Sequence, residues 1–132
     1  MDNKTLEKVR EIFAKDKFAT ENGAVIDEID KHCATCSLTI TERHLNAVGA
    51  VMGGVYFMLA DFAFAVAVNW EKMSCVSLRS DIAFLGTCKG KKMIAKAVCI
   101  KDGKSTVLYR IDITDELSNL VATVTTTGFK KA

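Results

Sequence analysis

The feature that most constrains this chain is an apolar stretch from Asn46 to Asn69 that contains a single carboxylate, Asp61. Between Val55 and Val68 no other side chain is charged, so a helix there would be apolar on every face and must be enclosed by other structure. Such a helix suits a protein core and is too short to cross a membrane. Because enclosing a carboxylate is costly, we expect a raised pKa for Asp61 and a functional role.

A glycine pair, Gly53 and Gly54, stands immediately before this run. A helix that begins there points unpaired backbone N–H groups out of its first turn, with the positive end of the helix dipole behind them. Glycines leave these amides open to a ligand. Such a terminus can stabilise the negative oxygen that forms when a carbonyl is attacked, although a glycine pair can also serve only as a tight turn.

The spacing between the two features predicts an oligomer. Gly54 and Asp61 are seven residues apart, which on one helix is roughly 10 Å along the axis. Catalytic groups must come within about 3 Å of the reacting atoms, so one small carbonyl cannot reach both groups of a single chain. A two-fold axis would bring each glycine pair to the carboxylate of the other copy. We therefore expect a homodimer with shared active sites.

Composition narrows the class of protein. The chain has 132 residues, of which 49% are hydrophobic, and this predicts a single globular domain over residues 1–132. The net charge of +2 is small and its cations are scattered, which excludes a nucleic-acid binder. The charged N-terminus lacks the apolar core of a signal peptide, so we expect a cytoplasmic protein with no membrane partner. Five cysteines in such a chain indicate reduced thiols.

Cys33 and Cys36, which follow His32, resemble half of a metal site or a redox motif. Zinc needs a second cluster, and a thioredoxin-like motif needs a strand-to-helix junction. Since this segment offers neither, we expect a hairpin turn whose cysteines pack as small apolar residues, and no metal.

Periodicity predicts one helix before the central one, over Thr5–Lys15, capped by Asp2 or Asn3. Its buried stripe is expected to consist of Leu6, Val9, Ile12 and Phe13. Two short strands are expected between residues 24 and 40, and a loop over residues 42–51 in which His44 is solvated.

After the central helix the chain alternates as strands. The expected strands cover residues 76–84, 92–101, 106–114 and 120–129. Asp102-Gly103 predicts a two-residue hairpin turn. One helix followed by hairpin-linked strands is typical of an α+β fold, with an antiparallel sheet and the helix on one face.

The central stretch resembles the phenylacetic-acid-degradation type of hotdog-fold acyl-CoA thioesterase. The residues that carry the resemblance are His44, Asn46, Gly49, Gly53, Gly54, Phe57, Leu59, Ala60, Asp61, Ala63, Phe64, Ala67 and Asn69. The resemblance implies a long helix wrapped by a curved antiparallel sheet, assembled as dimers and often tetramers. It implies hydrolysis of a small or medium acyl-CoA thioester, and an aryl-acetyl group is one candidate. No cofactor is implied, since coenzyme A belongs to the substrate.

The resemblance also implies roles for single residues. Asp61 matches the general base or nucleophile, the amide of Gly53 matches the group that polarises the thioester carbonyl, and Asn46 matches a residue that orients the reacting groups. Ser77 matches a serine that holds the attacking water, although a half-exposed strand serine needs no such role. Arg79 shares the mixed face of that strand.

Further residues are candidates for substrate binding. Lys89 and Lys91, together with Arg79, are candidates for the phosphates of coenzyme A, although a lysine-rich turn is usually only solvated. Phe57, with Phe64 and Trp70, indicates an apolar or aryl pocket, and all three also suit an ordinary core.

One position departs from the family pattern. The family has His-Gly-Gly where this chain has Met52-Gly53-Gly54. Methionine cannot donate a hydrogen bond or change its protonation state, which bears on rate and acyl specificity. The alternative is therefore a non-catalytic acyl-CoA sensor or scavenger on the same fold. A hydratase is disfavoured because no suitable histidine is near Asp61.

Overall fold

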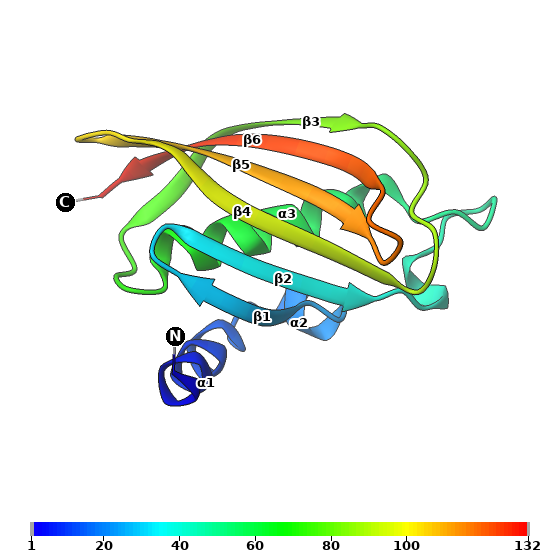
Figure 1. Ribbon diagram of the computed structural model, residues 1–132, viewed down its shortest axis with the longest axis horizontal. Helices are drawn as coiled ribbons and strands as arrows, with labels where there is room; N and C mark the ends of the chain where they lie inside the picture. Colours follow the sequence, from blue (N-terminus) through cyan, green and yellow to red (C-terminus); the bar gives the residue numbers. More distant parts are fainter. Residues whose placement is uncertain (1, 132) are drawn as a thin grey trace.

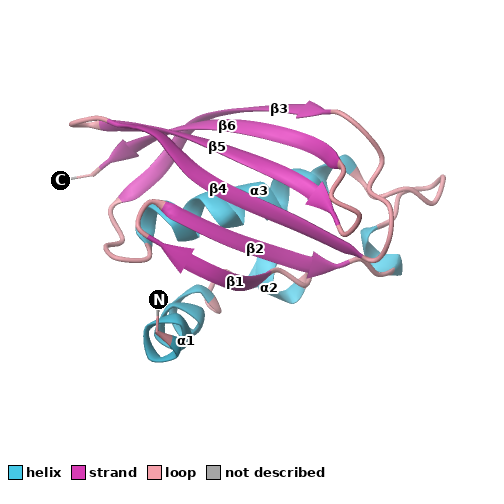
Figure 2. Cartoon of the chain, in the orientation of Figure 1, coloured by secondary structure: helices cyan, strands magenta, loops and turns pink. Residues whose placement is uncertain are grey.

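One long helix, α3 (Gly53–Asn69), lies against a six-stranded antiparallel sheet that curves around it (Figures 1 and 2). The computed structural model describes residues 2–131. The strand order is β1-β2-β4-β5-β6-β3. The strands are β1 (Val25–Asp30), β2 (Cys33–Thr39), β3 (Cys75–Phe84), β4 (Lys92–Asp102), β5 (Thr106–Asp115) and β6 (Leu120–Lys130). The other helices are α1 (Asn3–Phe13), α2 (Lys17–Glu21) and a 3-10 turn, η1 (Glu42–His44). This arrangement confirms the α+β hotdog fold.

Small residues let the helix approach the sheet closely. On α3, Ala60 and Ala63 are fully buried, and on β4 so are Ala95 and Ala97. Larger side chains then fill the space on either side of this contact, among them Leu59. The inner face of the sheet therefore holds α3 along its length.

The first helix begins where its cap predicts and ends earlier than expected. The Asp2 side chain accepts a hydrogen bond from the backbone N–H of Thr5, at 2.8 Å, and α1 ends at Phe13 rather than at Lys15. Val9 and Phe13 are buried as expected. Ile12 is 45% exposed, so the prediction that it belongs to the buried stripe was wrong. The reason is that α1 rests on the sheet edge at β1, which covers only a narrow part of its surface (Figure 1).

The strands agree with the sequence pattern, whereas two turns do not. The β4–β5 connection has three residues, 103–105, not two, because the N–H of Gly103 bonds to Thr106 O and the end of β6 bonds to Ser105 O.

The expected turn at Cys33–Cys36 is part of β2 instead. Cys36 is fully buried, while Cys33 lies three residues away and so on the opposite face. The two thiols therefore cannot bind one ion together.

The sheet has two edges, and they differ. The β1 edge is covered by α1, whose Arg10 donates from Nε and Nη2 to Ile26 O at 3.0 and 2.7 Å. The β3 edge is open and carries exposed Val76, Leu78 and Phe84. Open apolar edges are templates for pairing with another chain.

No helix within residues 2–131 is long and apolar enough to cross a membrane. The cytoplasmic location stays a prediction.

Gly128 on β6 provides a test of the packing between sheet and helix. A Cβ at this position would stand 2.7 Å from Cys75 Sγ and 2.9 Å from Phe64 Cζ. We expect Gly128→Ala to lower the free energy of unfolding by about 1–3 kcal/mol, because this is the usual cost of overpacking a core. Urea denaturation measures the change. The matched control is Gly86→Ala, whose Cβ would meet nothing within 4 Å. Equal stability of the two variants would contradict this packing.

Candidate active site

The N-terminus of α3 presents two backbone N–H groups without a protein partner. The preceding residue, Met52, has an extended conformation and makes no side-chain cap, while Val55 N already bonds to Met52 O at 2.9 Å. Among residues 2–131, nothing accepts a hydrogen bond from the N–H of Gly53 or of Gly54. The predicted free amides at the start of the helix are thus present, and their role in binding an anion stays a prediction.

The two glycines have different surroundings. A Cβ on Gly53 would lie 3.2 Å from Phe84 Cζ, so the end of β3 closes one side of the terminus. A Cβ on Gly54 would lie 2.8 Å from Met52 Cε. Met52 is 51% exposed, and its thioether methyl lies beside Gly54. This methionine stands at the position where the family pattern has a histidine.

His44 is a buried residue that holds the segment leading into α3, and it is not the solvated loop residue that we expected. It is 3% exposed, and its Nδ1 accepts from Thr41 N at 2.9 Å while Nε2 donates to Asn22 O at 2.6 Å. Its backbone oxygen accepts from Met52 N at 2.9 Å. His44 therefore links the segment around Asn22 to Met52, at the start of the helix.

Asn46 organises the loop that projects beyond the sheet in Figure 1. Its Oδ1 accepts from the N–H groups of Val48 and Ala50, both at 3.0 Å, and Gly49 takes a positive φ of 82° in this turn. The Asn46 side chain is exposed. Its oxygen thus holds the loop, while its amide nitrogen donates to no residue within the described range 2–131.

Asp61 lies in a groove of about 560 Å³ beside α2. The groove is lined by Lys15, Asp16, Lys17, Phe18, Ala19, Gly54, Phe57, Met58, Asp61 and Phe62. Such a volume is in the range of small-molecule sites. Gly54 and Asp61 both line it, but the helix rise still separates them by about 10 Å.

The carboxylate of Asp61 is not enclosed by its own chain, contrary to expectation. Gly54, Phe57 and Asp61 are exposed, and Ala65 and Val68 are only partly covered, so an open stripe runs along α3. Burial of the carboxylate among the groove atoms nevertheless raises the pKa of Asp61, and the charge of Asp16 raises it further. The expected direction of the shift is confirmed.

A β-bulge separates two residues that sequence alternation had placed on one face. Ser77 pairs with Gly128 and Arg79 with Thr127, so Leu78 is the extra residue. Ser77 therefore shares a face with Gly128, the inner face toward α3, whereas Arg79 lies on the outer face, 3.7 Å from Asp81. The prediction that Ser77 and Arg79 lie on the same face of the strand was therefore wrong.

The lysine-rich turn before β4 is held by acidic side chains. Lys89 N donates to Asp115 Oδ2 at 3.0 Å, and Lys91 N donates to Glu116 Oε1. Burial raises the pKa of Asp115, but hydrogen bonds from Asn119, Lys89 and Leu117 outweigh it and hold this pKa at about 2. The carboxylate is therefore ionised at neutral pH, and the side chains of Lys89 and Lys91 are exposed.

The same turn is attached to α3. Cys88 N donates to the hydroxyl of Tyr56 at 3.1 Å, and Tyr56 lies one turn after Gly53. The exposed lysines are thus fixed relative to the free amides.

The fold and this geometry agree with known proteins. The sequence matches the Thioesterase superfamily over residues 48–122, which is more than half of the chain. This protein belongs to the thioesterase superfamily. It is 31% identical over 123 residues to the acyl-coenzyme A thioesterase PaaI of Escherichia coli K12, covering 92% of this chain and 88% of that protein.

Solved structures agree with this assignment. The E. coli PaaI structure superposes with a TM-score of 0.87 at 27% identity, over 98% of this chain and 94% of that one. A mutant of the phenylacetic acid degradation protein PaaI from Thermus thermophilus gives a TM-score of 0.80 at 27% identity, over 86% and 97%. The expected family, fold and enzyme class, a thioester hydrolase, are confirmed.

The candidate pocket of this thioesterase contains aromatic residues that the sequence did not single out. Phe57 lines the groove as expected. Phe64 packs in the core, with its ring centroid 5.4 Å from that of Tyr109. The indole N–H of Trp70 donates to Asp30 O near the β1–β2 turn. Phe18 and Phe62 line the groove instead. A signal for Phe18 was present, since a large apolar residue stands among charged ones in a segment without helical periodicity.

The raised pKa of Asp61 in this thioesterase predicts a pH-dependent stability. A carboxyl with a higher pKa in the folded state loses stability as pH rises from its unfolded to its folded pKa. We expect Asp61→Asn to raise the melting temperature at neutral pH, and the difference to vanish near pH 3, where both states are protonated. Differential scanning calorimetry across this range checks the sign. A lower melting temperature of Asp61→Asn at neutral pH would contradict it.

Proposed function

We propose that this protein hydrolyses small or medium acyl-CoA thioesters, with aryl-acetyl groups among the candidates. The observation that carries the proposal is the pair of unpartnered amides at the start of α3, combined with one carboxylate in a groove along the same helix. The named relative, an acyl-coenzyme A thioesterase, supports coenzyme A as the leaving group.

In the proposed reaction the thioester oxygen accepts a hydrogen bond from Gly53 N–H, which stabilises the developing negative charge. Asp61 either takes a proton from water, whose oxygen attacks the carbonyl carbon, or attacks that carbon itself to form an anhydride that water then opens. In both routes the carbon–sulfur bond breaks and the thiolate of coenzyme A leaves and is protonated. The products are a carboxylic acid and free coenzyme A, and no cofactor takes part.

The site is proposed to be shared between two copies of the chain. Three features support this: the separation of Gly54 from Asp61, the open stripe of α3, and the exposed apolar edge of β3. Phe84 at the end of that edge lies against Gly53, so pairing along β3 would bring the second copy beside the free amides. Each carboxylate would then act with the amides of the other copy. A tetramer is implied only by the family resemblance.

Other residues are assigned supporting roles. Asn46 and Ser77 would orient the substrate and the attacking water, since the amide nitrogen of Asn46 has no acceptor among residues 2–131 and Ser77 lies on the inner face. Lys89 and Lys91 would bind the phosphates of coenzyme A from a turn anchored to Tyr56. Arg79 points outward beside Asp81, so a role for it requires a phosphate on the outer face of the sheet.

Replacing the carboxylate tests the catalytic assignment. We expect Asp61→Asn to lower kcat/KM for acyl-CoA hydrolysis by at least about 100-fold, because a general base or nucleophile is lost. Release of free thiol is the measurement, with circular dichroism as a check on the fold. The control is Asp112→Asn, the same change on β5, where the carboxylate contacts Thr123 and Arg110. Saturable acyl-CoA binding without turnover in the wild type would instead support the non-catalytic sensor.

Mixing two inactive variants tests the shared site. Gly54→Val is the better block of the amides, because its side chain meets the flexible end of Met52, whereas a side chain on Gly53 would strike Phe84. Refolded together, Asp61→Asn and Gly54→Val chains should form heterodimers with one intact site, restoring up to half of the wild-type activity per heterodimer. Each variant refolded alone is the control. Folded heterodimers without activity would show that both groups come from one chain.

A further inference from the structure

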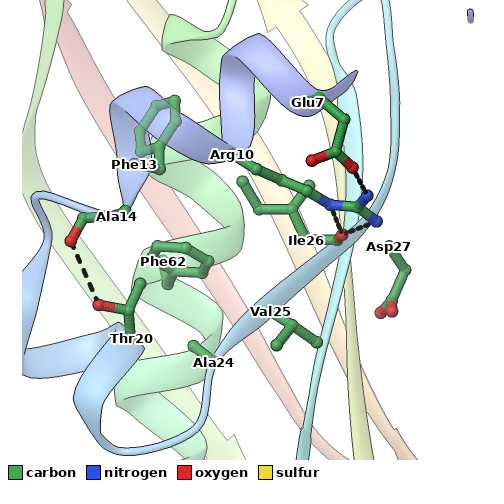
Figure 3. A pocket seen from close by; sticks show the side chains of 10 residues that line it. All are labelled: Glu7, Arg10, Phe13, Ala14, Thr20, Ala24, Val25, Ile26, Asp27 and Phe62. Carbon is green, nitrogen blue, oxygen red and sulfur yellow. Dashed lines mark hydrogen bonds and ion pairs between the residues drawn. The ribbon is translucent and has the colours of Figure 1, made fainter. Parts of the chain in front are cut away.

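A second cleft, of about 430 Å³, lies between α1, α2 and β1 (Figure 3). Its inner surface is apolar and consists of Phe13, Ala14, Ala24, Ile26 and Phe62. Figure 3 shows Phe62 extending from α3 toward this space, below Phe13 of α1. The two rings pack edge to face with centroids 6.2 Å apart.

The charges at the mouth of this cleft exclude an anionic ligand. Arg10 donates two hydrogen bonds to Ile26 O, and its remaining nitrogen pairs with Glu7, so each nitrogen of the guanidinium already has a partner and its charge is paired (Figure 3). Asp27 adds a negative charge beside it. A phosphate or carboxylate would meet no free cation there, whereas a neutral hydrocarbon would meet an apolar floor.

Phe62 separates this cleft from the groove that contains Asp61. Among residues 2–131 it is the one residue that lines both spaces, it follows Asp61 in sequence, and it is only 3% exposed, so it stands between the two spaces. The α1–α2 turn also borders both spaces, because Ala14 lines the cleft while Lys15 and Asp16 line the groove.

We propose that Phe62 is the end wall of the acyl-binding groove and determines the length of acyl chain that the enzyme accepts. The inference rests on the proposed function and adds a specificity-determining residue to it. An acyl group attached at the carbonyl beside Asp61 extends across the groove between α3 and α2 until it reaches the Phe62 ring. Removing the ring joins the groove to the cleft, and longer chains then enter an apolar space.

Chain-length profiles test this. Values of kcat and KM are measured for acetyl-, hexanoyl-, decanoyl- and hexadecanoyl-CoA with wild type, Phe62→Ala and the less disruptive Phe62→Leu. Each methylene newly buried is worth about fourfold in affinity. Phe62→Ala should therefore raise kcat/KM for decanoyl-CoA relative to acetyl-CoA at least tenfold, chiefly through KM, and Phe62→Leu should do so to a smaller extent.

A second substitution closes the new space again. Ala14 is exposed and lines the cleft, so Ala14→Phe in the Phe62→Ala or Phe62→Leu background should remove the gain for long chains. The matched control adds the same ring at Glu11, an exposed residue of α1 outside the cleft, and should keep the gain. Circular dichroism confirms that each variant is folded.

The outcomes separate the two proposals. Wild-type turnover with an unchanged chain-length profile in both folded Phe62 variants overturns the end-wall assignment and leaves the hydrolase intact. A gain that survives Ala14→Phe shows that long chains leave the groove by another path, and it overturns the connection between the groove and the cleft. Absence of wild-type turnover with these four thioesters and with an aryl-acetyl-CoA overturns the proposed function, and the end wall with it.

Discussion

The packing of α3 against the inner face of the sheet is the interaction on which the candidate site depends. Ala60 and Ala63 allow the helix to approach the strands closely, and the curved sheet then covers the apolar faces beside them. A helix held in this way positions its first-turn amides and the carboxylate of Asp61 as one rigid body. His44 and Phe84 fix the glycine end of that body from two sides, because one bonds to Met52 and the other lies against Gly53.

Much of the fold could be predicted because the sequence pattern agrees with the tertiary packing. The central helix begins at the glycine pair, and the β strands follow the alternation of apolar residues. The five-residue helix α2 could not be predicted, since it has no period of its own and depends on contacts with its neighbours. Ile12 fits the helical stripe of α1 but lies beyond the narrow sheet edge that α1 contacts. Helical periodicity shows which face of a helix is apolar, but not how much of that face its neighbour covers.

The site was predictable where the chemistry is local. The free amides follow from two glycines before an apolar helix, and the lone carboxylate from composition. The bulge at Leu78 could not be seen in the alternation, because one extra residue exchanges the faces of everything that follows. The burial of His44 was missed for a related reason. Asn22, the acceptor for its Nε2, lies 22 residues away in sequence, and only the folded chain brings the two together.

Stability and basicity have opposite requirements at Asp61. Full enclosure, as at Ala60 or Phe62, would make ionisation very costly, whereas full solvation would leave an ordinary, weakly basic carboxylate. The residue stands instead on the open stripe of α3, where surrounding groove atoms raise its pKa and Asp16 raises it further. The helix can therefore carry the charge within an apolar run because its own sheet leaves that stripe uncovered. A second copy of the chain that covered this stripe would remove more water from the carboxylate and raise its pKa further. In the proposed reaction, closing the groove would therefore also make Asp61 a stronger base.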